Sequence, residues 1–203
     1  MHIADRRPGL DENRLRHAIV IADERTIDQD PLYALRLLVD IAARALSPAV
    51  NDPTTAVQAL DRIESLLALL ATRRLDRGTL RDEHGNIRLV VPLPAWDDFL
   101  AVGLTEIRQY GATSTQVARR LRAVLEDLCR LAPASRRPAL EHQLVLLDQA
   151  VARAYPDPAE RDLALVADRH GLGEPARSRR PHLRADDAAS TEPAVGAPRP
   201  ETR

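Results

Sequence analysis

The sequence predicts a mainly α-helical domain of five to six helices with a small β-hairpin element and a disordered C-terminal tail. Two observations predict the helices: apolar residues recur every three or four positions through most of residues 30–151, and three Asp-Pro pairs precede helical stretches. A third observation places the hairpin, because the pattern changes at the β-rich run IRLVV of residues 87–91. Aromatic residues are only 2% of the chain, so Leu, Val, Ile and Ala must build the core.

The chain divides into three parts. Residues 1–24 form an N-terminal lead segment, in which HAIVIA at 17–22 is a candidate strand with a helix as the alternative. Residues 25–170 form the helical soluble domain. Residues 171–203 contain almost no large apolar residue, so this tail cannot bury enough surface to offset the entropy of ordering it.

The Asp-Pro pairs mark helix starts. The aspartate accepts hydrogen bonds from free amides of the first turn, and proline fits next because its missing N–H would have no helical partner there. The three pairs are Asp30-Pro31, Asp52-Pro53 and Asp157-Pro158. The first helix has an apolar face of Leu32, Leu35, Val39, Ala42 and Leu46. It should end near Leu46, since Ser47 precedes Pro48 and is pushed out of helical geometry.

The second helix follows Asp52, with an apolar stripe of Val57, Leu60, Ile63, Leu67 and Leu70. The short SPAVN linker makes these two helices antiparallel neighbours. Next, DEHGN at 82–86 has turn chemistry, which predicts a hairpin pairing residues 79–81 with 87–91.

Helices then resume. Residues 96–110 carry one apolar face, and Gly111 is expected in the left-handed conformation just past that helix. Thr113 and Gln116 have the spacing of a capping box, which would open a helix through Leu131. A fifth helix is expected over residues 140–151 and a short sixth over 163–167.

Composition excludes several kinds of chemistry. All 29 basic residues are arginine, which we attribute to codon bias in a GC-rich genome, so no lysine can bind a phosphate or form a Schiff base. The net charge of −1 and the few aromatic residues argue against nucleic-acid binding. Cys129 is the single cysteine, which excludes an intrachain disulfide and is typical of a small core residue.

No cofactor and no catalytic residues are expected, because no known catalytic motif is present and the histidines lack metal-site spacing. The chain has no apolar run long enough to span a bilayer and no secretory signal. On its own, it is therefore expected to be cytoplasmic.

Candidate binding residues cluster around the first two helices. Arg36, Asp40 and Arg44 lie four residues apart and form one row, which favours a structural ion-pair ladder over a ligand site. The start of the second helix adds hydroxyl, amide and carboxylate groups that could meet an anion. Together the candidate ligand-binding residues are Arg36, Asp40, Arg44, Ser47, Asn51, Asp52, Thr54 and Thr55. A metal site using Asp28, Asp30 and Asp52 is the less favoured alternative, since two of these cap helices.

The same region resembles a known family. The matching segments are RT at 25–26, QD at 29–30, LR at 35–36, LVDIA at 38–42, RALSP at 44–48 and NDPTTA at 51–56. They resemble a bacterial family of predicted membrane proteins, the domain of unknown function 2254, and the similarity extends to the helix around residue 147. The resemblance implies a domain on the cytosolic face of the inner membrane, following an N-terminal block of transmembrane helices.

This chain departs from that pattern because only the soluble C-terminal part of the family is represented and the membrane helices are missing. It is expected to be a gene fragment, a truncated reading frame or a free-standing paralogue. The leading hypothesis is an interaction or regulatory domain that binds a protein partner, either a membrane protein or a second copy. The alternative is an anion or small-ligand sensor, or an enzyme, using the Arg36, Asp40 and Arg44 row and the helix start at 51–55.

Overall fold

The computed structural model describes residues 2–3, 30–75 and 78–173. In them, six α-helices and one short 3-10 helix accompany three strands, which confirms the mainly α fold with a hairpin. The helices are α2 (Pro31–Ala45), α3 (Pro53–Thr72), α4 (Trp96–Gly111), α5 (Thr115–Leu131), α6 (Arg137–Ala154) and α7 (Pro158–Ala164), with the 3-10 turn at Ala134–Arg136. The strands are β1 (His2–Ile3), β2 (Thr79–Arg81) and β3 (Ile87–Val90). The candidate strand at 17–22, Asp28 and residues 174–203 of the tail lie outside the described residues.

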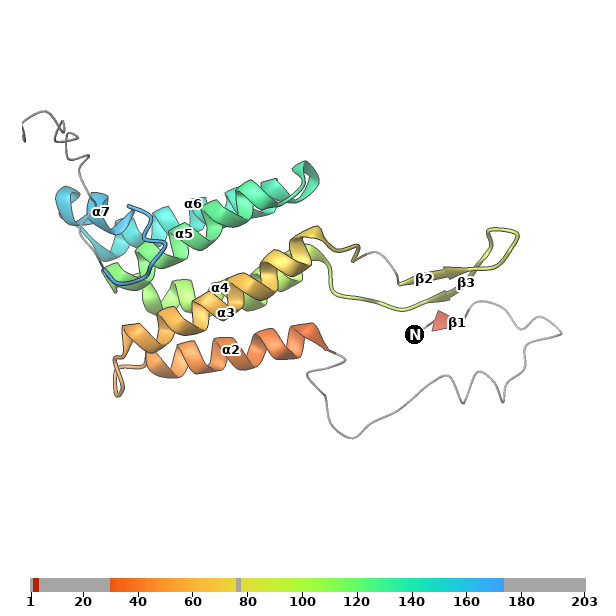
Figure 1. Ribbon diagram of the computed structural model, residues 1–203, viewed down its shortest axis with the longest axis horizontal. Coiled ribbons are helices and arrows are strands. Elements are labelled where there is room, and N and C mark those ends of the chain that lie inside the picture. Colours follow the sequence, from red (N-terminus) through yellow and green to blue (C-terminus); the bar gives the residue numbers. More distant parts are fainter. Residues whose placement is uncertain (1, 4–29, 76–77, 174–203) are drawn as a thin grey trace, which may run out of the picture.

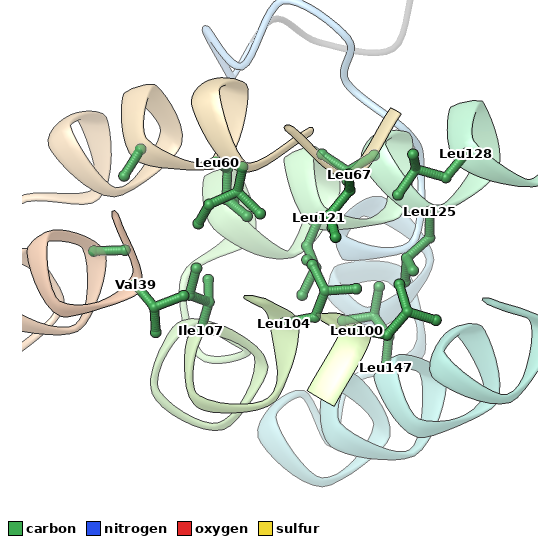
Figure 2. Packing of buried hydrophobic residues seen from close by; sticks show 14 of the residues in the cluster. Val39, Leu60, Leu67, Leu100, Leu104, Ile107, Leu121, Leu125, Leu128 and Leu147 are labelled. Atoms are coloured by element: carbon green, nitrogen blue, oxygen red, sulfur yellow. The ribbon is translucent and has the colours of Figure 1, made fainter. Parts of the chain in front are cut away.

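The helices form a layered bundle around one apolar core. Helix α3 packs between α2 and α5, while α4 contacts both α2 and α6 (Figure 1). Leucines from α3, α4, α5 and α6 meet in the centre, where Leu67, Leu104, Leu121 and Leu147 are almost fully buried (Figure 2). The core is thus aliphatic, as the low aromatic content predicts.

The three Asp-Pro helix starts are confirmed. Asp30 accepts from the amides of Leu32 and Tyr33, and Asp157 accepts from those of Ala159 and Glu160. Asp52 accepts from the Thr55 amide at 3.0 Å. Each helix begins at the proline that follows the cap. Helix α2 ends at Ala45 with Leu46 as its C-cap, also as predicted.

The expected role of Gly111 is wrong. Gly111 is the last residue of α4 and does not have a positive φ. A Cβ there would lie 2.5 Å from Cγ1 of Val117, so the glycine permits close packing between the end of α4 and the start of α5. The requirement for glycine at this position comes from packing and not from a left-handed turn.

The predicted capping box is also wrong. Ser114 is the N-cap of α5, and no side chain forms a capping hydrogen bond there. The Gln116 side chain instead donates to the backbone carbonyl of Gly171 at 2.7 Å, because the segment after α7 folds back onto α5.

The last helix lies earlier than expected, over Pro158–Ala164 and not 163–167. It ends where the chain turns towards α5, and the buried Asp168 carboxylate then accepts from the amides of His170, Gly171 and Gly173. Arg119 of α5 donates to the carbonyl of Val166 at 3.1 Å. The bonds from Arg119 and Gln116 hold residues 166–173 against α5, including three residues that the sequence assigns to the tail, while the bonds to Asp168 lie within this segment.

The hairpin of β2 and β3 forms where predicted, and β1 adds a third antiparallel strand beside β3. Asp82 stabilises the turn by accepting from the amides of His84 and Asn86, and Gly85 supplies the positive φ of 80°. The sheet projects from the end of the bundle where α3 ends and α4 begins (Figure 1). It therefore contributes little to the helical core.

Candidate functional site

Half of the candidate residues surround one hollow at the corner between α2 and α3. Asp40 and Arg44 from α2 and Asp52 and Thr55 from the start of α3 line a space of about 610 Å³. The tight turn between the helices, in which the Asp52 amide donates to the Ala45 carbonyl at 2.8 Å, brings these groups together. The rest of the wall is apolar, formed by Leu37, Ile41, Ala45 and Val50. Arg36, Ser47, Asn51 and Thr54 do not line this hollow.

The charged row is split between two roles. The Arg36 guanidinium donates to Asp40 Oδ1 at 2.8 Å and to Glu106 Oε2 of α4 at 2.9 Å, so it joins α2 to α4. The hydrogen bonds that Arg36 donates to Glu106, together with those to Asp40, raise the pKa of Arg36. No hydrogen bond or ion pair joins the exposed Arg44 side chain to another described residue. The row is therefore a partial ladder with one cation left at its end.

The start of α3 uses its polar groups internally. The Thr55 hydroxyl donates to Asp52 Oδ2 at 2.5 Å, and this bond, aided by the Thr55 amide, lowers the pKa of Asp52. Asn51 adopts a positive φ of 47°. Its backbone N–H donates to the Ser47 carbonyl at 2.9 Å and so closes the turn. Because Asp52 is an anion at neutral pH, this helix start repels phosphate or carboxylate.

A second hollow of about 510 Å³ adjoins the first. It is lined by Leu38, Ile41, Thr55, Gln58, Ala59, Asp61 and Arg62. Ile41 and Thr55 belong to both walls, so the Ile41 side chain, which is 51% exposed, stands between two depressions. We call the surface formed by Leu37, Asp40, Ile41, Arg44 and Val50 the outer face.

A third hollow, also of about 510 Å³, lies where α3, α4 and the 3-10 turn meet. There the Arg136 guanidinium donates to the carbonyls of Leu70, Ala71 and Arg73 and lies 5.4 Å from the Trp96 ring centroid. Its donors satisfy carbonyls at the C-terminus of α3, which is a structural use of arginine. No local sequence pattern predicts this arrangement, because the partners of Arg136 lie more than 60 residues away along the chain.

Among the described residues, no group of three or more His, Cys, Asp or Glu side chains could hold a metal ion. The outer face combines an apolar centre with one carboxylate, that of Asp40, and one uncompensated arginine, Arg44. Such a surface lacks the converging donors of an anion site and the converging acceptors of a cation site. It has the apolar centre and polar rim of a protein-binding surface.

The carboxylates of this region should make stability depend on pH. Hydrogen bonding to Arg36 lowers the pKa of Glu106, and Thr55 lowers that of Asp52. A carboxylate whose pKa is lower in the folded state contributes stability that is present above its unfolded pKa of about 4 and lost as pH falls through the folded pKa. The urea midpoint of the chain should therefore fall as the pH is lowered through this range.

Glu106→Gln should show a smaller fall of the urea midpoint than the wild type, whereas Glu83→Gln, at an exposed turn, should match the wild type. Parallel curves for wild type and Glu106→Gln would contradict a stabilising role of the Arg36–Glu106 pair.

Comparison with known proteins finds a family match and three relatives. Residues 2–127 match the family described as "Predicted membrane protein (DUF2254)", a match that begins earlier than the resemblance at residues 25–56 suggests. Uncharacterized proteins of Mycobacterium bovis and of two Mycobacterium tuberculosis strains, CDC 1551 and H37Rv, are each 39% identical over 166 residues, which are 79% of this chain and 31% of the relative. The chain thus spans about a third of the length of these relatives.

No solved structure matches the chain. None of the helices in the described part is both long and apolar enough to cross a bilayer. The family match nevertheless covers more than half of the residues and includes the whole of the α2–α3 corner. The chain belongs to this family of predicted membrane proteins.

Proposed function

We propose that this chain is a protein-interaction module and that the outer face is its binding surface. The observation that carries the proposal is the exposure of two large aliphatic side chains, Ile41 at 51% and Val50 at 54%, beside open hollows. An apolar patch rimmed by polar groups is typical of a surface that a partner covers. Asp40 and Arg44 would supply the polar rim.

The family match supports a location for this module beside a membrane. Its members are described as predicted membrane proteins, and the curated relatives are about three times as long as the part this chain matches. We propose that the domain works on the cytosolic side of a membrane assembly and there holds a protein partner. The whole assembly's activity is a separate question from the binding that the outer face provides.

A small-ligand sensor is the second candidate, favoured by the volume of the hollow. About 610 Å³ falls within the range of about 300–1,000 Å³ that ligand pockets occupy. The polar groups argue for a protein partner, however, because Arg36 is engaged by Glu106 and the two carboxylates that line the hollow are acceptors only. An anion would meet one free arginine beside two negative charges.

Site-specific photo-crosslinking tests the proposal. A photoreactive amino acid would replace Ile41 or Val50 in the chain produced in a bacterium, and Leu69 or Val145 as controls of similar exposure away from the outer face. We expect protein adducts from positions 41 and 50, identified by mass spectrometry, and none from positions 69 and 145. Adducts at the control positions alone would overturn the proposal, and the absence of protein adducts at all four would favour the small-ligand candidate.

A further inference from the structure

We propose that the outer face binds a second copy of this chain, in a two-fold arrangement that sets Asp40 of each copy against Arg44 of the other. This inference rests on the proposed function, since it names the partner of the same surface. A two-fold interface places one patch against itself, so the patch must complement its own charge and shape. The outer face meets both requirements.

Asp40 and Arg44 are opposite in charge, and each has hydrogen-bonding groups that no described residue uses. Arg44 has no acidic partner among the described residues, and both bonds that Arg36 gives to Asp40 go to Oδ1. Asp40 Oδ2 thus accepts no hydrogen bond from a described residue, and the Asp40 side chain is 51% exposed. One unfilled acceptor and one unfilled donor therefore lie on the same surface.

The spacing of these two groups fits a two-fold axis. Asp40 and Arg44 lie one helical turn apart on the outer side of α2. When two α2 helices pack antiparallel with the axis between these turns, Asp40 faces the partner's Arg44 and Arg44 faces the partner's Asp40. One symmetric packing then forms two ion pairs, and no like charges of this row oppose each other.

The shape of the surface agrees with the same packing. Ile41 projects between two hollows, one towards Val50 and one towards Gln58. A projecting side chain flanked by depressions can enter a depression of an identical surface, as ridges enter grooves between packed helices. Burial of Ile41, Leu37 and Val50 from both copies would supply the affinity, while the charges fix the orientation.

The test is sedimentation equilibrium of the purified full chain together with two charge-reversal variants, Asp40→Arg and Arg44→Asp. The wild type should form a dimer. Each single variant should dissociate at least about tenfold more readily, because it places like charges in contact. The double variant, Asp40→Arg with Arg44→Asp, should restore the dimer. An equimolar mixture of the two single variants should form a heterodimer, since the remaining charges are then opposite at both contacts.

Controls separate lost association from lost folding. Circular dichroism melts should show that each variant remains folded, because Arg36 keeps its ion pair with Glu106 in all of them. Ile41→Glu offers a second way to block the same contact, and it leaves Arg36, Asp40 and Arg44 unchanged. A monomeric wild type, or single variants that dimerise as tightly as the wild type, would overturn the proposal of a second copy. Photo-crosslinks from positions 41 and 50 to a different protein would then leave the proposed function standing, and their absence would remove both.

Discussion

Leu67→Ala is expected to lower the free energy of unfolding by about 2–5 kcal/mol, the usual cost of truncating a fully buried leucine. Leu67 of α3 is completely buried and lies in the central leucine cluster with Leu121, Leu125 and Leu128 of α5 (Figure 2). With so few aromatic residues, the contact between α3 and α5 depends on these leucines.

The matched control is Leu69→Ala, two residues further along the same helix. Leu69 is 55% exposed, so its truncation should change stability by no more than about 0.5 kcal/mol. Urea unfolding followed by circular dichroism measures both. Equal losses for the two variants would show that the orientation of α3 is different from that described.

Gly171→Ala is expected to have a comparably large effect, a loss of about 2–5 kcal/mol. The residue has a φ of 66°, which costs a side-chain-bearing residue about 1–2 kcal/mol. An added Cβ would also lie 2.4 Å from Cγ1 of the buried Val57, and such overpacking costs about 1–3 kcal/mol. Residues 166–173 should therefore detach from α3 and α5.

Two further variants separate these causes. Gly173 has a similar φ of 72° but nothing within 4 Å of its added Cβ, so Gly173→Ala should show the conformational cost alone. Val57→Ala combined with Gly171→Ala should be more stable than the sum of the two single losses predicts, because the truncation removes the clash. Trypsin cleavage after Arg169 reports detachment directly. Equal cleavage in Gly171→Ala and Gly173→Ala would show that contact with Val57 is unimportant.

Those features of the fold that depend on neighbours in sequence could be predicted. Asp30, Asp52 and Asp157 cap helices because each carboxylate reaches amides two or three residues away. The roles of Gly111 and Gln116 could not be predicted, for the opposite reason. Their roles depend on Val117 across a turn and on Gly171, 55 residues away, and no local pattern encodes such contacts.

The candidate site shows the same division. The short turn after Ser47 predicts that the end of α2 meets the start of α3, and Asp40, Arg44, Asp52 and Thr55 do share one hollow. The partner of Arg36 could not be predicted, because Glu106 lies 70 residues away on α4. The apolar pattern, by contrast, does separate Val39, which belongs to the predicted apolar face and is buried, from Ile41, which lies off that face and is exposed.

In-cell footprinting tests the outer face most directly. A reagent that labels exposed aliphatic side chains would be applied to the chain in the cell and to the dilute purified chain, and the extent of labelling compared residue by residue. If the outer face is covered by a partner, labelling of Leu37, Ile41 and Val50 should fall in the cell, while Leu69 and Val145 should be labelled equally in both samples. Equal labelling of Ile41 and Val50 in the two samples would contradict the account.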